Sequence, residues 1–495
     1  MSRRLTFLIA GAVIFGAATF GVAQQALFSV GPATAQQSET YRQLNMFGEI
    51  FERIRADYVD QVDEATLIQA AINGMIGALD PHTEYMPADA FQEMQYQTRG
   101  EFGGLGIEVT MEDGIIKVVS PIADTPADRA GVLAGDTILA LDGTPTDGLT
   151  LNEAVDMMRG DPGTPIVITF GREGVAEPFD IEIVRDIIEA QLIRTEIFDT
   201  VAYVRLITFS DGAAQDIQGA IEQMTAEIGP DRISGVILDI RNNPGGLLDQ
   251  SIAVTDLFLN QGEVVSTRGR NTQDTRRYNA REGDFTNGLP LIVLVNGGSA
   301  SASEIVAGAL QDHRRATILG TISFGKGSVQ TILPLAPGDG ALRLTTARYY
   351  TPSGRSIQAV GIEPDIIVEQ VLPPELQAQI ANLPPLGEAA LPGHLGVEEG
   401  VTEQRASIPY IPRDPADDTQ LQFAIGLLTG TEQNPNFPPD PNAPPPAPIV
   451  ATPANPPAPV EPVPGPADPA PAPVPMPVEP APAPEPAPAP APPAP

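Results

Sequence analysis

The sequence lacks cysteine and tryptophan entirely, and its 495 residues include only three histidines. Without cysteine there is no thiol protease, and a zinc site built from Cys and His is disfavoured, so we expect neither a metal nor a cofactor. Positive charge is also scarce, because 28 Lys and Arg stand against 63 Asp and Glu, a formal charge of −35. Nucleic-acid phosphates require a basic surface, so nucleic acid is excluded as a partner.

Proline is the abundant residue, with 53 copies, and it gathers at the C-terminus, where residues 431–495 read largely as Pro-Ala repeats. Each proline removes a backbone donor and fixes φ, so neither helix nor sheet forms in such a stretch. We interpret residues 431–495 as a disordered, solvated tail rather than as a ligand for a partner.

The N-terminus has the layout of an export signal. Arg3 and Arg4 precede an uncharged run over residues 5–23, and the next charged residue is Glu39. Small residues at 21–23 and 33–35 offer cleavage sites, which makes residues 1–35 a signal segment. The same run is close to the minimum length for a membrane span, so the alternative is an anchor through residues 5–23. Both alternatives export the chain. We expect it in the periplasm of a Gram-negative bacterium, soluble after cleavage or anchored to the inner membrane.

Residue patterning predicts a mixed α/β multidomain fold. Residues 40–99 form an N-terminal helical region, because Phe47, Ile50, Phe51 and Ile54 recur at helical spacing. Pro81 is expected to break this helical pattern, since proline disfavours helix at the residue before it. Residues 100–186 are β-rich. Residues 187–372 form an α/β core with a mixed sheet, in which the apolar runs 236–240 and 291–295 suit buried strands. Residues 373–430 are expected to pack on that core as an extension.

The β-rich region carries a peptide-binding signature. A glycine loop precedes an expected strand and consists of Gly104, Leu105, Gly106 and Ile107. Such a loop can point its backbone N–H groups at a carboxylate. The edge of the strand that follows can pair with an extended peptide. The run through residues 126–143 and 149–160 resembles a PDZ domain of the bacterial protease type. The resemblance implies capture of C-terminal or unfolded segments of other proteins.

A candidate nucleophile lies where residues 296–305 follow the apolar strand at 291–295. A strand, a turn of small residues and a helix expose a serine oxygen at a helix N-terminus, where the dipole favours negative charge. Ser299, Ser301 and Ser303 compete for this role, and N-capping of the helix is the alternative reading for each.

The sequence places no histidine next to this serine that could act as its base. His313 lies twelve residues after Ser301 on the same expected helix, about 18 Å away, and His82 and His394 belong to other segments. Lysine serves when burial keeps it neutral. Of the two lysines, Lys117 belongs to the PDZ-like region, which leaves Lys326.

Gln330 follows Lys326 by four residues, and its amide oxygen is placed to accept from the lysine. With residues 296–305, the run 323–330 resembles the carboxyl-terminal processing peptidase family of serine proteases. This resemblance implies that Ser301 is the nucleophile, Lys326 the general base and Gln330 its support. The family usually has threonine where this chain has Ser323, which keeps the hydroxyl.

The run 241–248 also matches that family. The match implies an oxyanion hole made by the N–H of Gly245 or Gly246 together with that of Ala302. Glu304 and Asp312 match as structural support. The resemblance covers roughly residues 40–372 and 418–428.

Two other functions compete. Residues 320–326 fit most of a phosphate-binding loop, but Gly327 stands where the Mg²⁺-binding Ser or Thr belongs and a strand is expected next. A catalytically silent PDZ adaptor predicts loss of Ser301, Lys326 or Gln330, and all three are present. The expected partners are protein or peptide substrates, with a homo-oligomer or an activating adaptor as alternatives. Arg159 is the candidate for coupling peptide binding to activity.

Overall fold

The computed structural model describes residues 32–112, 114–374, 376–377 and 386–446. The predicted signal at residues 1–35 and the predicted tail at 431–495 therefore lie largely outside the described residues. Among the helices that are described, none has both the length and the apolar character needed to cross a membrane.

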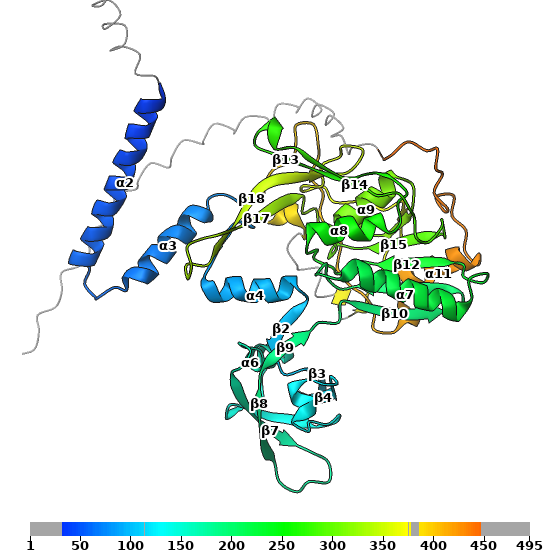
Figure 1. Ribbon diagram of the computed structural model, residues 1–495, viewed down its shortest axis with the longest axis horizontal. Coiled ribbons are helices and arrows are strands. Elements are labelled where there is room, and N and C mark those ends of the chain that lie inside the picture. Colours follow the sequence, from blue (N-terminus) through cyan, green and yellow to red (C-terminus); the bar gives the residue numbers. More distant parts are fainter. Residues whose placement is uncertain (1–31, 113, 375, 378–385, 447–495) are drawn as a thin grey trace, which may run out of the picture. The chain divides into compact units, whose positions relative to one another are not determined.

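Three helices form the N-terminal region: α2 (Pro32–Asp57), α3 (Glu64–Ile76) and α4 (Ala88–Thr98) (Figure 1). The Asp63 side chain caps α3 by accepting from the Thr66 N–H. The break predicted around Pro81 is present, and the chain then forms the short strand β1 (Glu84–Met86). Phe47 and Ile50 on α2 are more than half exposed, so the apolar face of this helix is not covered by the described chain.

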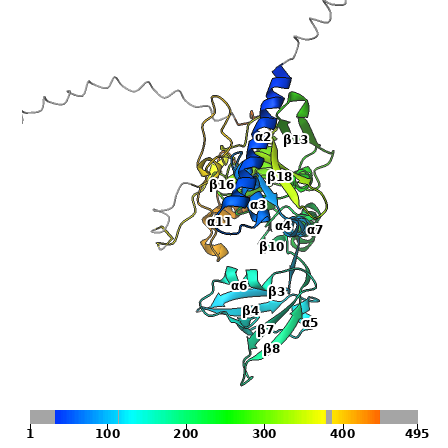
Figure 2. The same cartoon turned by 90° about the vertical axis from the view of Figure 1, so that its left-hand side faces the viewer.

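The β-rich region forms its own sheet and core (Figure 2). Six of its strands lie in the order β3-β4-β5-β7-β8, with β6 paired to β5. Their bounds are β3 (Ile107–Glu112), β4 (Ile115–Pro121), β5 (Thr137–Leu141), β6 (Thr144–Pro145), β7 (Pro165–Gly171) and β8 (Phe179–Val184). The helices α5 (Pro126–Arg129) and α6 (Leu151–Met158) accompany them, and α6 begins with a capping box between Thr150 and Glu153. A separate pair, β2 (Glu101–Gly104) and β9 (Asp186–Glu189), connects this region to the rest of the chain.

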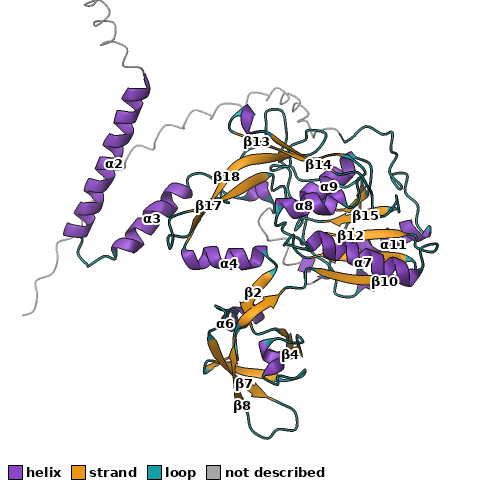
Figure 3. Ribbon diagram, viewed as in Figure 1, coloured by secondary structure: helices purple, strands orange, loops and turns teal. Residues whose placement is uncertain are grey.

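A six-stranded mixed sheet in the order β10-β11-β12-β15-β16-β19 forms the α/β core (Figure 3). Only β10 runs antiparallel to its neighbour. The bounds are β10 (Ile193–Phe198), β11 (Val201–Leu206), β12 (Gly235–Asp239), β15 (Leu291–Val295), β16 (Thr317–Gly320) and β19 (Ile366–Ile367). Every residue of β12 and β15 is buried, as their continuous apolar runs predict.

Helices cover both faces of this sheet. The helices α7 (Ala213–Ile228), α8 (Leu248–Asp256) and α9 (Ala302–Asp312) share one apolar cluster with alternate strand residues such as Leu238 and Val293. The residues between them, such as Ile237 and Ile292, join a second cluster with α11 (Thr419–Thr429). The fold class predicted from the sequence is confirmed, including the mixed sheet.

A second sheet carries the strand that follows Lys326. Its order is β1-β18-β13-β14, and β17 pairs with β18. The bounds are β13 (Gly262–Gly269), β14 (Arg276–Ala280), β17 (Ser328–Pro334) and β18 (Ala341–Tyr350). Short 3-10 turns occur at η1 (Thr272–Asp274), η2 (Glu388–Ala390) and η3 (Pro415–Asp417).

A buried ionic cluster joins α11 to the end of β12. Arg241, 1% exposed, bonds both Asp239 and Asp418, at 2.6 and 2.8 Å, and also Gln420. Asp418 in turn caps α11 by accepting from the Leu421 N–H. Each charge in this cluster has an opposite partner, which satisfies the condition under which buried ions are tolerated.

Candidate active site

Ser301 lies at the turn between β15 and α9, in a backbone conformation with φ +53° that non-glycine residues rarely adopt. The three competing serines differ in environment. Ser299 is buried and donates its hydroxyl to the Ile240 carbonyl at 2.8 Å, and Ser303 is buried and donates to the Asn243 carbonyl at 2.9 Å. Ser301 is only partly buried. Two of the three hydroxyls are thus committed to the scaffold, and the strained residue between them remains partly accessible.

Glu304 links the two expected catalytic residues. Its Oε2 accepts from the backbone N–H of Ser301 at 2.8 Å and from that of Lys326 at 2.9 Å. Those two nitrogens are therefore separated by no more than the sum of these distances. Its Oε1 accepts from the Ser323 hydroxyl at 2.6 Å and the Gly325 N–H at 2.7 Å. One carboxylate, fully buried, thus holds the start of α9 against the loop that carries the lysine.

The same carboxylate has a perturbed ionisation. Burial raises the pKa of Glu304 to about 7, although the four hydrogen bonds it accepts favour the charged form. Ser323 supplies one of these bonds and also accepts from the Ile362 N–H at 2.7 Å. The hydroxyl at position 323 therefore has a defined structural task, which either serine or threonine can perform.

Lys326 lies in the loop before β17 and makes no ion pair within the described part of the chain. Burial lowers the pKa of its ammonium group, and the positive charge of Arg343 lowers it further. The carboxylates of Glu388, Glu304 and Asp80 oppose this effect. A lysine in this environment is closer to the neutral form that a general base requires.

Gln330 lies in β17 opposite Thr345 of β18. Its amide nitrogen donates to the Ser328 hydroxyl at 2.9 Å and to the Thr345 hydroxyl at 3.2 Å. The spacing argument from Lys326 does not apply here, because the lysine precedes the strand. The amide nitrogen is nonetheless fully used, so the oxygen is the end of the side chain that remains to accept from an ammonium group.

The glycines expected in the oxyanion hole lie beside this turn. A Cβ on Gly245 would stand 2.9 Å from the Ser301 Cβ and 3.0 Å from the Ala302 nitrogen, so only glycine fits. The Gly245 N–H donates to the Asn243 side chain at 2.9 Å. A substrate carbonyl would compete with that bond for Gly245, whereas the neighbouring Gly246 is exposed.

The peptide-binding loop of the β-rich region is held by its carbonyl groups. The Leu105 oxygen accepts from the Ala127 N–H at 2.9 Å, and the Gly106 oxygen accepts from the Ile122 N–H at 2.8 Å. Gly106 has φ +74°, and a Cβ there would meet Thr125 at 2.3 Å. Carbonyl groups turned inward leave the N–H side of the loop facing away from the scaffold, as carboxylate capture requires. Gly104 pairs with Asp186 of β9, and Ile107 opens β3.

Arg159 ends α6, and its guanidinium lies over the ring of Phe102 at 5.4 Å. Phe102 belongs to β2, the strand that connects the β-rich region to α4. The residue chosen for coupling therefore contacts the connection itself.

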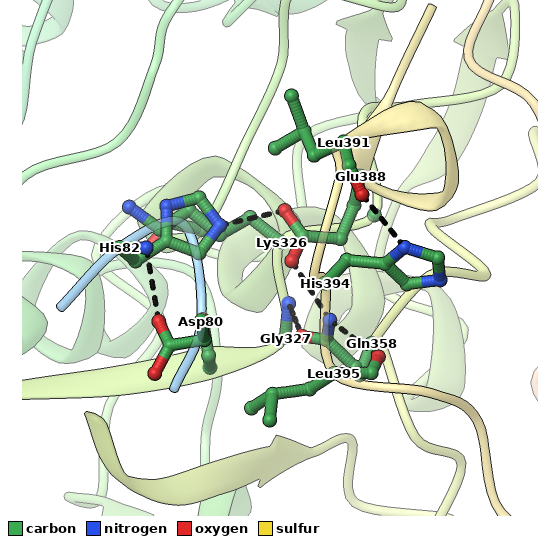
Figure 4. A network of polar contacts seen from close by, with 12 residues as sticks. Asp80, His82, Lys326, Gly327, Gln358, Glu388, Leu391, His394 and Leu395 are labelled. Atoms are coloured by element: carbon green, nitrogen blue, oxygen red, sulfur yellow. Dashed lines mark hydrogen bonds and ion pairs between the residues drawn. The ribbon is translucent and has the colours of Figure 1, made fainter. Parts of the chain in front are cut away.

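The three histidines come from different segments of the chain, and two of them, His82 and His394, lie near Glu388 (Figure 4). His313 ends α9 and contacts the Glu263 carbonyl at 2.7 Å, consistent with its expected distance from Ser301. His394 contacts Glu403 at 3.0 Å. His82, which the sequence argument set aside, contacts the buried Glu388 at 2.7 Å, close to Lys326 (Figure 4). No group of acidic or histidine side chains in the described ranges is arranged to hold a metal ion.

Comparison with known proteins agrees with this architecture. The model described as Peptidase family S41 matches residues 200–368, that of the PDZ domain matches 117–172, and that of the activating protease CtpB N-terminal domain matches 7–90. The α/β core with its serine turn and the PDZ domain thus define a serine-type peptidase.

More specifically, the chain belongs to the carboxy-terminal processing protease family. It is 54% identical over 442 residues to the carboxy-terminal-processing protease of Bartonella bacilliformis, covering 89% of this chain and 99% of that one. It is 33% identical to the carboxy-terminal processing protease CtpB of Bacillus subtilis, over 68% of this chain and 71% of the relative. Among solved structures, the photosystem II D1 C-terminal processing protease is 29% identical, covering 66% of this chain and 88% of that one, with a TM-score of 0.39.

Proposed function

We propose that this peptidase cleaves protein substrates with a Ser301–Lys326 dyad, after its PDZ domain captures their C-terminal or unfolded segments. The observation that carries the proposal is the shared anchor: one Glu304 oxygen binds the backbone N–H groups of both residues. Ser301 is the only one of the three serines that is both strained and partly accessible. These features support catalysis over the silent-adaptor alternative, which requires none of them.

The proposed chemistry assigns one role to each of these groups. Lys326 takes the proton of the Ser301 hydroxyl as the oxygen attacks the substrate carbonyl, and returns it to the leaving amine. Water then hydrolyses the acyl-enzyme. The Ala302 N–H at the start of α9 and a glycine N–H from residues 245–246 stabilise the oxyanion, assisted by the helix dipole.

A lysine comparison tests the dyad. The protein from residue 36 onward would be incubated with an unstructured substrate and, separately, with a fluorophosphonate that labels activated serines. Ser301→Ala, Lys326→Ala and Lys326→Arg should all lose cleavage and labelling, because arginine keeps the charge but does not act as a base near pH 7. Lys117→Ala is the matched control, since it changes the only other lysine. Cleavage by Lys326→Ala at the wild-type rate would refute the dyad.

The PDZ domain and Arg159 form the second part of the proposal. The contact between Arg159 and Phe102 supports a coupling role, because Phe102 lies on the connection to α4. Arg159→Ala should lower the stimulation of cleavage by a C-terminal peptide while leaving peptide binding intact. Lys117→Ala, which removes an exposed ion pair with Glu112 between two strands of the PDZ sheet, is the control. An unchanged stimulation ratio would remove Arg159 from the mechanism.

Export remains part of the proposal and rests on residues 3–23. A fusion of the N-terminal 35 residues to a reporter that is active only outside the cytoplasm tests it, and comparison of membrane and soluble fractions separates a cleaved signal from an anchor. The exposed apolar face of α2 supports association with a second copy or an adaptor. The mass of the purified protein in solution tests the former.

A further inference from the structure

The segment 80–83, between α3 and β1, is buried more deeply than the helices before it. Asp80 is 7% and Thr83 is 6% exposed, whereas most of α2 and α3 is exposed. Directly after it, β1 pairs antiparallel with β18 in the register Glu84↔Arg343. The N-terminal region is therefore anchored to the sheet that carries Gln330.

A chain of hydrogen bonds leads from Asp80 to Gln330. The Thr345 hydroxyl donates its single proton to Asp80 Oδ1 at 3.0 Å, and so its oxygen accepts from the Gln330 amide nitrogen at 3.2 Å. Asp80 also accepts from the His82 N–H and from the Thr83 N–H and hydroxyl. Burial opposes ionisation of Asp80, but these hydrogen bonds hold its pKa below the ordinary value. The side chain is therefore a carboxylate, which accepts hydrogen bonds and donates none. Asp80 thereby fixes the direction of the Thr345 hydroxyl. The Thr345 oxygen in turn binds the amide nitrogen of Gln330, so the amide oxygen of Gln330 is the end that points away from Thr345.

A second chain leads from His82 to the loop that carries Lys326 (Figure 4). His82 Nε2 contacts Glu388 Oε2 at 2.7 Å. The other oxygen of Glu388 accepts from the Gln358 amide nitrogen at 2.8 Å, and the Gln358 oxygen accepts from the Gly327 N–H at 3.1 Å. The Glu388 N–H also donates to the Phe324 carbonyl at 3.0 Å. The loop is thus held on both sides of the lysine.

The contact with His82 has an electrostatic consequence. Glu388 is fully buried, and its charge acts on Lys326. A buried carboxylate needs a charged or hydrogen-bonding partner, and His82 provides one. If His82 were absent, the negative charge of Glu388 would be left to Lys326, the cation on which it already acts. An ion pair between Glu388 and Lys326 would keep the lysine protonated and hold its amine away from Ser301. The charged groups that act on Lys326 are Arg343, Glu388, Glu304 and Asp80.

We propose that the segment 80–83 is a positioning element of the active site, in which Asp80 orients Gln330 through Thr345, and His82 occupies Glu388 so that Lys326 stays unpaired. Asp80 and His82 are positioning residues and touch no substrate. The proposal rests on the dyad proposed above. It makes the catalytic geometry of the core dependent on a segment of the N-terminal region, more than 200 residues earlier in the chain.

His82 is tested with the complete exported chain. His82→Phe should lower kcat at least about tenfold with KM changed less than about twofold, a split expected when a group positions the chemistry and not the substrate. The rising limb of the kcat/KM profile should also move to higher pH, because Lys326 gains a carboxylate partner. His82→Asn, which keeps a donor, should restore part of both. His313→Ala is the matched control, because this histidine lies at the opposite end of α9 from Ser301, and it should leave both unchanged. A wild-type kcat and pH profile for His82→Phe would overturn this arm.

Asp80 is tested by a double-mutant cycle, which also serves if His82→Phe fails to fold. Thr345→Val, which keeps the charge of Asp80, should lower kcat in the wild-type background and have no further effect in a Gln330→Ala background, because its influence passes through that amide. Asp80→Asn should lower kcat in the wild-type background and keep only the effect of its charge on Lys326 in the Gln330→Ala background. Equal losses in both backgrounds would overturn the relay. Unchanged activity of Lys326→Arg would instead refute the dyad itself, which keeps the two failures distinct.

Discussion

Glu304→Gln is the substitution that most directly tests how the site is held together. The carboxylate accepts four hydrogen bonds, two on each oxygen, and the amide keeps only one oxygen. Its NH2 group then faces two donors, so two bonds are lost and two buried donors are left without partners. Each unsatisfied donor costs about 1–3 kcal/mol. The lost carboxylate charge offsets part of this cost.

The free energy that Glu304 contributes to folding depends on pH, and the direction of this dependence follows from its pKa. Burial raises the pKa of Glu304 from 4.5 to about 7, so the wild-type protein is stabilised by this group below its unfolded pKa and loses that stability as pH rises through 7. Between pH 5 and pH 8 the loss amounts to about 2–3 kcal/mol. Glutamine does not titrate. The Glu304→Gln protein is therefore expected to be less stable than the wild type at pH 5, with the two stability curves converging by pH 8.

The assay is urea unfolding of both proteins at several pH values, together with kcat on an unstructured substrate. Because Ser301 and Lys326 share one oxygen of Glu304, we expect kcat to fall about 100-fold. Ser323→Thr keeps the hydroxyl that donates to Glu304 and should stay within about twofold of the wild-type rate. Parallel stability curves would refute the buried, titrating carboxyl. An unchanged kcat would refute its role as the common anchor.

Three further outcomes are expected. The kcat/KM of the wild type should rise with pH through a pKa below the ordinary 10.5 of lysine, because neutral Lys326 is the active form; a profile that falls over this range would contradict it. Gly245→Ala should abolish activity, since its Cβ would stand 2.8 Å from a carbonyl oxygen, whereas Gly219→Ala, with open space around it, should be neutral in the same cleavage assay. Arg241→Ala should lower the free energy of unfolding in urea by about 3–5 kcal/mol, because it leaves two buried carboxylates unpaired. Arg277→Ala, which removes an exposed ion pair, is the control and should cost under about 1 kcal/mol.

The parts of the fold that could be predicted are those written in local patterns. The strands β12 and β15 are continuous apolar runs, and the loop at Gly106 precedes its strand as PDZ loops do. The order of residues around Ser301 and Lys326 was enough to select both from the sequence, although their roles remain predictions.

What the sequence left out depends on pairs that are distant in the chain. His82 and Glu388 are 306 residues apart, and neither lies in a pattern that indicates the other. The break at Pro81 was read only as the end of a helix, yet it turns Asp80 and His82 toward the catalytic loop. Gly245 could not be distinguished from Gly246, because the difference is a single hydrogen bond to Asn243. A histidine beside Asp-Pro, in an enzyme with only three histidines, was the one available signal.

The cluster around Arg241 also bears on the order of folding. Its partners Asp418 and Gln420 are nearly 180 residues away in sequence, and α11 supplies the helix on one face of the central sheet. While residues 418–428 are absent, Arg241 has only Asp239 as its buried partner, and apolar residues of β12 and β15 are exposed on that face. A chain that emerges from its N-terminus therefore completes its core only when α11 arrives. We therefore expect the core to be completed late, once residues 418–428 are available, and such long-range closure is expected to be slow.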